Sequence, residues 1–172
     1  DNLEHHKTFA TGKNRMQMNP AFRPDKSILI DASHFNDYIK ALGTAADLHI
    51  KSFDDLCEAL QKRMDYFHAY GCSTADHGLE YIPFREAPQS EIERIFSKRR
   101  TGSQLEREES EKFQTALLLF LGKEYHRLGW VQQFHLGAMR NNNSRMFKKL
   151  GPDTGWDSIG QYPIAQNLSR FL

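Results

Sequence analysis

Residues 130–143 read WVQQFHLGAMRNNN, and this stretch decides which fold the chain favours. If residues 130–134 are extended and His135 ends the strand, Gln133 and His135 share one face, while Phe134 lies on the other. The three asparagines that follow suit a loop whose backbone bends back on itself. The stretch therefore predicts a strand with one apolar face and a histidine on the other face, near its end.

Two earlier segments have the same organisation. Strand-like residues 15–22 precede Arg23-Pro24-Asp25, and strand-like residues 71–75 precede Asp76-His77-Gly78. Apolar residues at helical spacing occupy most of the sequence between the three segments. Helices are expected over 31–46, 52–70 with a Ser52/Asp55 capping pair, 90–98, 104–128, 144–150 and 162–172. Alternating strands and helices predict an α/β fold with a parallel sheet, in which polar side chains at the carboxyl ends of the strands carry the chemistry.

Composition limits the possible functions. The 172 residues fit one domain, with 39% hydrophobic and 26% charged residues and a net charge of +1. This balance does not favour binding to nucleic acid or to an anionic membrane, and there is no apolar run of membrane-spanning length. Two cysteines, Cys57 and Cys72, are too few for a disulfide scaffold and indicate a reducing, cytoplasmic compartment.

Length also limits the architecture. A (β/α)8 barrel needs about 250 residues, so three strands in 172 residues cannot close one. The chain also opens with a polar run and no Met. We therefore expect residues 1–172 to be a single internal segment of a longer protein, with no second domain.

Each polar cluster has a functional and a structural interpretation. Arg23 could clamp a carboxylate with its planar guanidinium, or pair with Asp25 at a surface turn. Asp76 and His77 could move protons or bind metal, or form a turn with a solvated histidine. His135 could be a metal ligand or an acid/base group, or a satisfied core histidine. The chain has no His-x-His or other zinc-type spacing, so by itself it holds no complete metal site.

Four motifs resemble the uronate isomerases (the glucuronate isomerase family), a branch of the amidohydrolase superfamily. They are Phe22-Arg23-Pro24-Asp25, Asp76-His77-Gly78, residues 133–143 (QFHLGAMRNNN) and residues 150–160 (LGPDTGWDSIG), and Leu3-Glu4-His5-His6 is also similar. The resemblance implies a distorted amidohydrolase-type (β/α)8 barrel, to which this chain supplies the middle strands, about four to six, with their crossover helices. It also implies an aldose–ketose isomerase of hexuronic acids, converting glucuronate to fructuronate and galacturonate to tagaturonate.

The same resemblance implies the site residues and the cofactor. Arg23 would bind the sugar acid with help from Asn141 and Asn142, Asp76 would take part in substrate binding or proton handling, and His135 would neighbour or ligate a divalent metal, expected to be zinc. The main metal ligands of the family, a His-x-His pair and a late Asp, are absent from this sequence, so the chain alone should be inactive. The longer enzyme is expected to be a homo-oligomer.

Two rival interpretations remain at this point. An open parallel sheet exposes edge strands, so the chain could be a non-catalytic segment that is stable only through self-association. Alternatively, it could belong to a metal-dependent hydrolase of the same superfamily, in which a metal-bound water attacks the substrate.

Overall fold

Two parallel strands, β1 (Thr74–Leu79) and β2 (Val131–Leu136), form the sheet at the centre of the structure. The structure is a computed structural model that describes residues 1–11 and 17–172. Its other elements are α1 (Glu4–Thr11), α2 (Asp25–Ile28), α3 (Phe35–Ala46), α4 (Phe53–Ala69), α5 (Gln89–Arg100), α6 (Arg107–Leu128), β3 (Ala138–Met139), α7 (Ser144–Leu150), β4 (Ser158–Ile159) and α8 (Ile164–Phe171). The chain therefore has the predicted α/β character, with more helix than strand.

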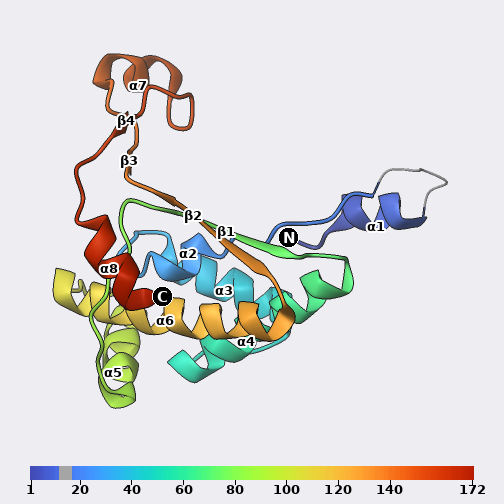
Figure 1. The fold of residues 1–172 in the computed structure, drawn as a ribbon. Coiled ribbons are helices and arrows are strands. Elements are labelled where there is room, and N and C mark those ends of the chain that lie inside the picture. The colour runs from blue at the N-terminus through green and yellow to red at the C-terminus, as the bar shows by residue number, and fades with distance from the viewer. Residues whose placement is uncertain (12–16) are drawn as a thin grey trace.

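The register of the sheet places the predicted polar residues side by side. Asp76 lies opposite Gln133, and Gly78 lies opposite His135, so these four residues share one face. The other face of β1 is buried, and on β2 it is partly buried. Figure 1 shows the two strands lying across the helices, with α6 running beneath them.

The first predicted strand is largely absent. Residues 15 and 16 lie outside the described part of the chain, residues 17–21 are not in a strand, and only Phe22 pairs with β1, as a single parallel bridge to Ala75. Phe22 donates to the carbonyl of Thr74 and accepts from the amide of Asp76, which places it on the edge of β1 away from β2. The prediction of a full strand here was wrong, but the order of the three segments in the sheet is the expected one.

The second strand prediction was wrong in its bounds. Residues 71–75 were expected to be extended and Asp76-His77-Gly78 to follow the strand, but β1 begins at Thr74 and contains all three residues. The third strand extends two residues further than expected, and His135 lies inside it. Asp and Gly have low strand propensity, and pairing along both edges of β1 overrides it.

The helices match the sequence more closely. The capping box at the start of α4 is present, because Ser52 accepts from the amide of Asp55 and the Asp55 carboxylate accepts from the amide of Ser52. Helix α6 ends at Gly129, which adopts the left-handed φ of 69° that favours glycine. Between β1 and β2 the crossover contains both α5 and α6, as the wide spacing of the strands predicts.

The hydrophobic core is a single cluster of aliphatic and aromatic side chains, and it contains two groups of contacting aromatic rings. Phe113 of α6 packs edge-on against Phe35 and Phe53 and stacks on Phe96. Each such pair contributes about 0.5–1.5 kcal/mol beyond its buried area. The second group lies under β1 and comprises Phe22, Phe67, Tyr125 and Trp130. It fixes the place where the chain passes from Phe22 into Arg23.

The end of the chain is organised differently from the body. Strands β3 and β4 pair antiparallel and carry α7 between them, and in Figure 1 this unit projects away from the sheet. Helix α8 returns to the body, where Phe171 packs edge-on against Phe134 at 5.7 Å. Among the described residues, no helix has the continuous apolar stretch that crossing a membrane requires.

Candidate active site

Arg23 lies immediately after the Phe22 bridge, at the carboxyl end of that segment. Its side chain is about half exposed, and its Nε donates to Oδ2 of Asp25 at 3.1 Å. The Nη1 atom lies 3.5 Å from Oδ2 of Asp76. The guanidinium is therefore held between two carboxylates, from α2 and from β1, with part of its donor fork open to solvent.

Asp76 connects Arg23 to the second strand. Its Oδ1 lies 2.7 Å from Nδ1 of His135, a shorter distance than that between Asp76 and Arg23. The two atoms are not aligned for a hydrogen bond, and Oδ1 is buried without a hydrogen-bond partner. A buried carboxylate oxygen without a donor is unfavourable, since such a group retains the cost of losing its water. Oδ1 of Asp76 is therefore a candidate acceptor for a donor or cation bound beside His135.

His135 completes the convergence. Its side chain is 50% exposed on the open face of β2, and its Nε2 lies 3.3 Å from the side-chain amide nitrogen of Gln133. The expected division of faces is observed, because Phe134 and Leu136 pack against the core from the other side of the strand. Arg23, Asp76 and His135 are therefore brought together on one face of the sheet.

Two further residues, His77 and Asp25, support this cluster from the helical side of the sheet. His77 was interpreted either as chemical or as a solvated turn residue, but it is completely buried on the helical face of β1. Its Nδ1 lies 3.1 Å from Oδ1 of Asp25, and its Nε2 lies 3.2 Å from the hydroxyl of Tyr125. The burial of His77 could have been predicted from the sequence, because in a strand it shares a face with Ala75 and Leu79. All three side chains are buried.

Asp25 receives three donors. Oδ1 faces His77, while Oδ2 accepts from Nε of Arg23 and from the backbone amide of Gly78 at 3.0 Å. Burial acts to raise the pKa of Asp25, but the hydrogen bonds from His77, Gly78 and Arg23 outweigh it, so the pKa lies below its usual value of 3.8. Asp25 is therefore a largely buried carboxylate that holds Arg23, His77 and Gly78 together, rather than the partner of Arg23 in a surface turn.

The structure does not bring Asn141 and Asn142 into this cluster. They lie between β3 and α7, in the unit that projects from the sheet in Figure 1. Asn141 has a left-handed φ of 57°, as expected for a bend, and its amide donates to Asp157 at 2.8 Å. Asn142 lines a shallow surface hollow beside Trp156. Their substrate-binding role stays a prediction.

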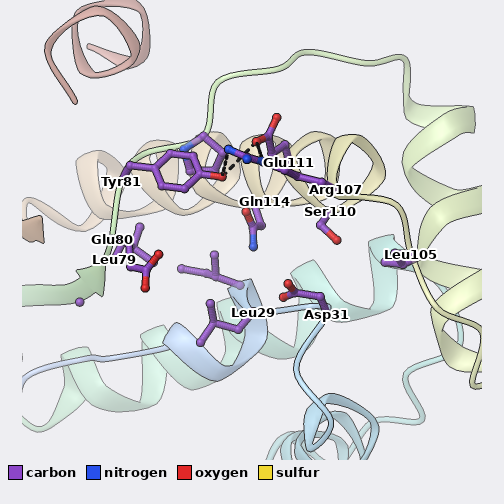
Figure 2. A pocket seen from close by; sticks show the side chains of 13 residues that line it. Leu29, Asp31, Leu79, Glu80, Tyr81, Leu105, Arg107, Ser110, Glu111 and Gln114 are labelled. Carbon is purple, nitrogen blue, oxygen red and sulfur yellow. Dashed lines mark hydrogen bonds and ion pairs between the residues drawn. The ribbon is translucent and has the colours of Figure 1, made fainter. Parts of the chain in front are cut away.

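A cavity of about 600 Å3 begins where β1 ends, and Figure 2 shows the side chains that line it. Tyr81 donates to Glu111 at 3.0 Å, and Glu111 also accepts from Arg107 at 2.9 Å, so the polar groups on one wall satisfy each other. Gly78 lines this cavity, but Arg23, Asp76 and His135 do not. Arg23 lines a different hollow, of about 330 Å3, together with Tyr38 and Arg63.

The site has part of what a metal needs. An imidazole and a carboxylate oxygen are both common zinc ligands, and Oδ1 of Asp76 lacks a donor. However, residues 1–11 and 17–172 contain no group of three or more His, Cys, Asp or Glu side chains arranged to hold an ion. The pair fits one side of a metal site, and further ligands would have to come from outside the chain.

The site combines a guanidinium, a carboxylate and an imidazole on one face of a parallel sheet in an α/β protein, and a half-exposed guanidinium suits recognition of an anionic ligand. A family model described as glucuronate isomerase matches residues 1–172, so the chain belongs to that family. It is 53% identical over 172 residues to the uronate isomerase of Flavobacterium johnsoniae and 51% identical over 173 residues to that of Yersinia enterocolitica. All of this chain is covered in both comparisons, but it spans only 37% of the length of either relative.

Solved structures agree on the fold. The crystal structure of a uronate isomerase from Thermotoga maritima superimposes with a TM-score of 0.93 at 27% identity, covering 100% of this chain and 38% of that one. The glucuronate isomerase of Caulobacter crescentus gives a TM-score of 0.88 at 23% identity, covering 100% and 36%. At 23% identity, the similarity to the second structure supports the fold only.

Proposed function

We propose that this chain forms the middle of a uronate isomerase that interconverts aldose and ketose hexuronates, glucuronate with fructuronate and galacturonate with tagaturonate. The observation that carries the proposal is the convergence of Arg23, Asp76 and His135 on one face of a parallel sheet. Family membership over the whole chain supports the reaction class. The remaining strands would close the barrel around this face, with residues 1–172 as one segment and no separate domain.

Arg23 has the chemistry to recognise the substrate's carboxylate. A guanidinium presents parallel N–H donors that match a carboxylate in a bidentate pair. Asp25 occupies Nε and Asp76 lies near Nη1, so the outer edge of the half-exposed fork is the part available to a ligand. Asn141 and Asn142 are proposed to contribute amide contacts to the sugar acid when the projecting unit lies against the rest of the protein.

Asp76 and His135 would act on the other end of the substrate. Isomerisation removes the C2 proton of the aldose, returns a proton to C1, and transfers the hydroxyl proton from O2 to O1, through an enediol. Asp76 is proposed to handle a proton beside the reacting carbons, and His135 to orient and polarise the neighbouring oxygens. The 2.7 Å contact between them allows the imidazole and the carboxylate to face the same substrate atoms.

A divalent metal, expected to be zinc, would supply Lewis-acid polarisation of the substrate oxygens when bound. His135 would lie next to the metal or ligate it, with its Nδ1 atom 2.7 Å from Oδ1 of Asp76. The full enzyme is proposed to be a homo-oligomer. Both cysteines are unpaired, which fits a cytoplasmic setting.

The test uses the full-length protein that contains these residues, supplied with zinc. Proton NMR in D2O follows conversion of each uronate and exchange at C1 and C2. We expect turnover of at least one uronate, a raised KM in Arg23→Gln, and a loss of about 10²–10⁴-fold in kcat for Asp76→Asn and His135→Gln. Tyr66→Phe is the control, because its hydroxyl donates to the backbone carbonyl of Asn2 and lies near the Lys7 ammonium, and neither partner belongs to the candidate site.

Two results would contradict the proposal. Absence of conversion of both uronates by the metal-loaded protein would remove the isomerase assignment. Hydrolysis of a sugar lactone or amide in its place would favour the hydrolase alternative. Light scattering on the 172-residue chain addresses the remaining alternative, because a compact monomer excludes stabilisation by self-association.

A further inference from the structure

Asp25, His77 and Tyr125 form a continuous hydrogen-bonded chain from the core to the candidate site. The His77 ring lies between the other two, 3.1 Å from Oδ1 of Asp25 and 3.2 Å from the Tyr125 hydroxyl. His77 is fully buried, and Phe134 stacks on its ring at 5.4 Å. The imidazole therefore has no access to solvent, and these two partners satisfy both of its nitrogens.

The direction of the hydrogen bonds follows from chemistry. Burial raises the pKa of Tyr125, so its hydroxyl stays protonated and can donate to Nε2 of His77. Asp25 is a carboxylate and can only accept, so Nδ1 of His77 carries a proton and donates to it. One neutral histidine tautomer thus satisfies every group in the chain.

The far end of this chain is the substrate side. The second oxygen of Asp25 accepts from Nε of Arg23 and from the amide of Gly78. Gly78 also leaves the space that the guanidinium occupies, because a Cβ at this position would lie 2.5 Å from Nη2 of Arg23. One carboxylate is thus fixed to the core through Oδ1 and orients the guanidinium through Oδ2.

We propose that Asp25, His77 and Tyr125 are positioning residues that fix the direction of the Arg23 guanidinium for a hexuronate carboxylate. This inference rests on the proposed function of Arg23. None of the three touches the substrate. They act through Arg23, whose long side chain would otherwise sample many rotamers and lose binding energy to their entropy.

A purely structural role makes a different prediction. If the chain only satisfies buried polar groups, breaking it lowers stability and leaves substrate binding unchanged. If it positions Arg23, breaking it raises the KM for hexuronate more than it lowers kcat. In a variant in which residue 23 has no guanidinium to orient, breaking the chain should then have little further effect on KM, because the effects of coupled residues are not additive.

The experiment measures KM, kcat and the thermal unfolding midpoint on the full-length, metal-loaded protein. The variants are Asp25→Asn and Tyr125→Phe, each made alone and combined with Arg23→Lys. We expect Asp25→Asn to raise KM about tenfold, as for the loss of one hydrogen bond to a charged group, and Tyr125→Phe, which removes a bond between neutral groups, to raise KM about fivefold. In the Arg23→Lys background, each should add less than about twofold, because a lysine ammonium has no fork to orient. Tyr66→Phe is the matched hydroxyl control.

A second pair of variants separates the two bonds of His77. The amide nitrogen of His77→Asn overlaps Nδ1 and can still donate to Asp25, whereas that of His77→Gln overlaps Nε2 and can reach only Tyr125. Positioning requires the asparagine variant to raise KM no more than Tyr125→Phe does, because both lose only the bond between His77 and Tyr125, and the glutamine variant, which loses the bond to Asp25, to raise KM further. Equal KM values for the two variants would overturn the inference.

The outcomes are distinguishable. If the parent protein does not bind or convert a hexuronate, the proposed function and the inference fail together. The inference alone fails in a second case, in which the parent converts a hexuronate and Arg23→Lys raises KM. In that case either Asp25→Asn and Tyr125→Phe leave KM unchanged, or their effects on KM multiply with the effect of Arg23→Lys. If Asp25→Asn does not fold, Tyr125→Phe decides, because it removes one hydroxyl and keeps the packed ring.

Discussion

Gly78→Ala should damage the candidate site without damaging the fold. Gly78 has no positive φ, so alanine introduces no backbone strain. The new Cβ would lie 2.5 Å from Nη2 of Arg23, which is the far end of a flexible, half-exposed side chain. The guanidinium can retreat into solvent at little cost in stability, but it then leaves the position that Asp25 and Asp76 define.

The size of the effect follows from this geometry. Ordinary van der Waals contact begins at 3.4 Å, so Nη2 must move by roughly 1 Å. A misplacement of about 1 Å in a binding group can lower the rate about 10²-fold. We therefore expect kcat/KM for the hexuronate to fall between about tenfold and about a hundredfold, mainly through KM. The midpoint of thermal unfolding should stay close to that of the parent.

Gly43→Ala provides the matched comparison. Its Cβ would lie 2.6 Å from the backbone carbonyl oxygen of Leu48, which cannot move without disturbing the end of α3. This variant should lower the unfolding midpoint and leave KM unchanged in the fraction that folds. The assay is steady-state isomerisation by the full-length protein, with circular dichroism for unfolding. A Gly78→Ala protein with kcat/KM within twofold of the parent would refute the argument that Gly78 makes room for a substrate-binding guanidinium.

Three further predictions concern stability, pH and completeness. Ser52→Ala removes one half of the capping box of α4 and should lower the free energy of unfolding by about 1 kcal/mol without changing kcat, as measured by urea unfolding. Because the folded-state pKa of Asp25 is depressed, its stabilising effect is complete above the usual value of 3.8 and is lost as the pH falls through the lower folded value. The difference in unfolding free energy between the parent and Asp25→Asn should thus be constant above about pH 5 and shrink below about pH 4, and a difference that grows with acid would contradict this sign. The isolated 172-residue chain should show no turnover of glucuronate or galacturonate even with added zinc, because its described residues hold no group of three metal-binding side chains, and measurable turnover would disprove this.

The helices could be predicted from the sequence because their signals are local. The Ser52/Asp55 pair and Gly129 mark helix ends through contacts within a few residues, and both occur as expected. The bounds of β1 could not be predicted in this way. Asp76-His77-Gly78 has the composition of a turn, and it is extended because Phe22 and β2 pair with β1 on its two edges.

Part of the candidate site could also be predicted from the sequence. Side chains of like parity on neighbouring parallel strands lie on one face of a sheet, which places Arg23, Asp76 and His135 together. The supporting residues were missed because their contacts are long-range. Tyr125 belongs to an apolar stripe of α6 in the sequence, and only the packing of α6 under β1 brings its hydroxyl to His77. The β3–α7–β4 unit was also missed as a hairpin, because each of its strands has only two residues.

The dipeptide Asp76-His77 shows why the strand matters for the chemistry. In the predicted turn, both side chains could point toward solvent and share one task. In β1 they must point to opposite faces, so Asp76 meets Arg23 and His135 while His77 is buried against Tyr125. Asp25 at the carboxyl end of the sheet reconnects the two faces, because its two oxygens reach His77 on one side and Arg23 on the other. Any rearrangement that shifts β1 by one residue would exchange these faces, placing a carboxylate in the core and an imidazole in the site. The two roles of this dipeptide therefore depend on the register with β2, in which Asp76 lies opposite Gln133.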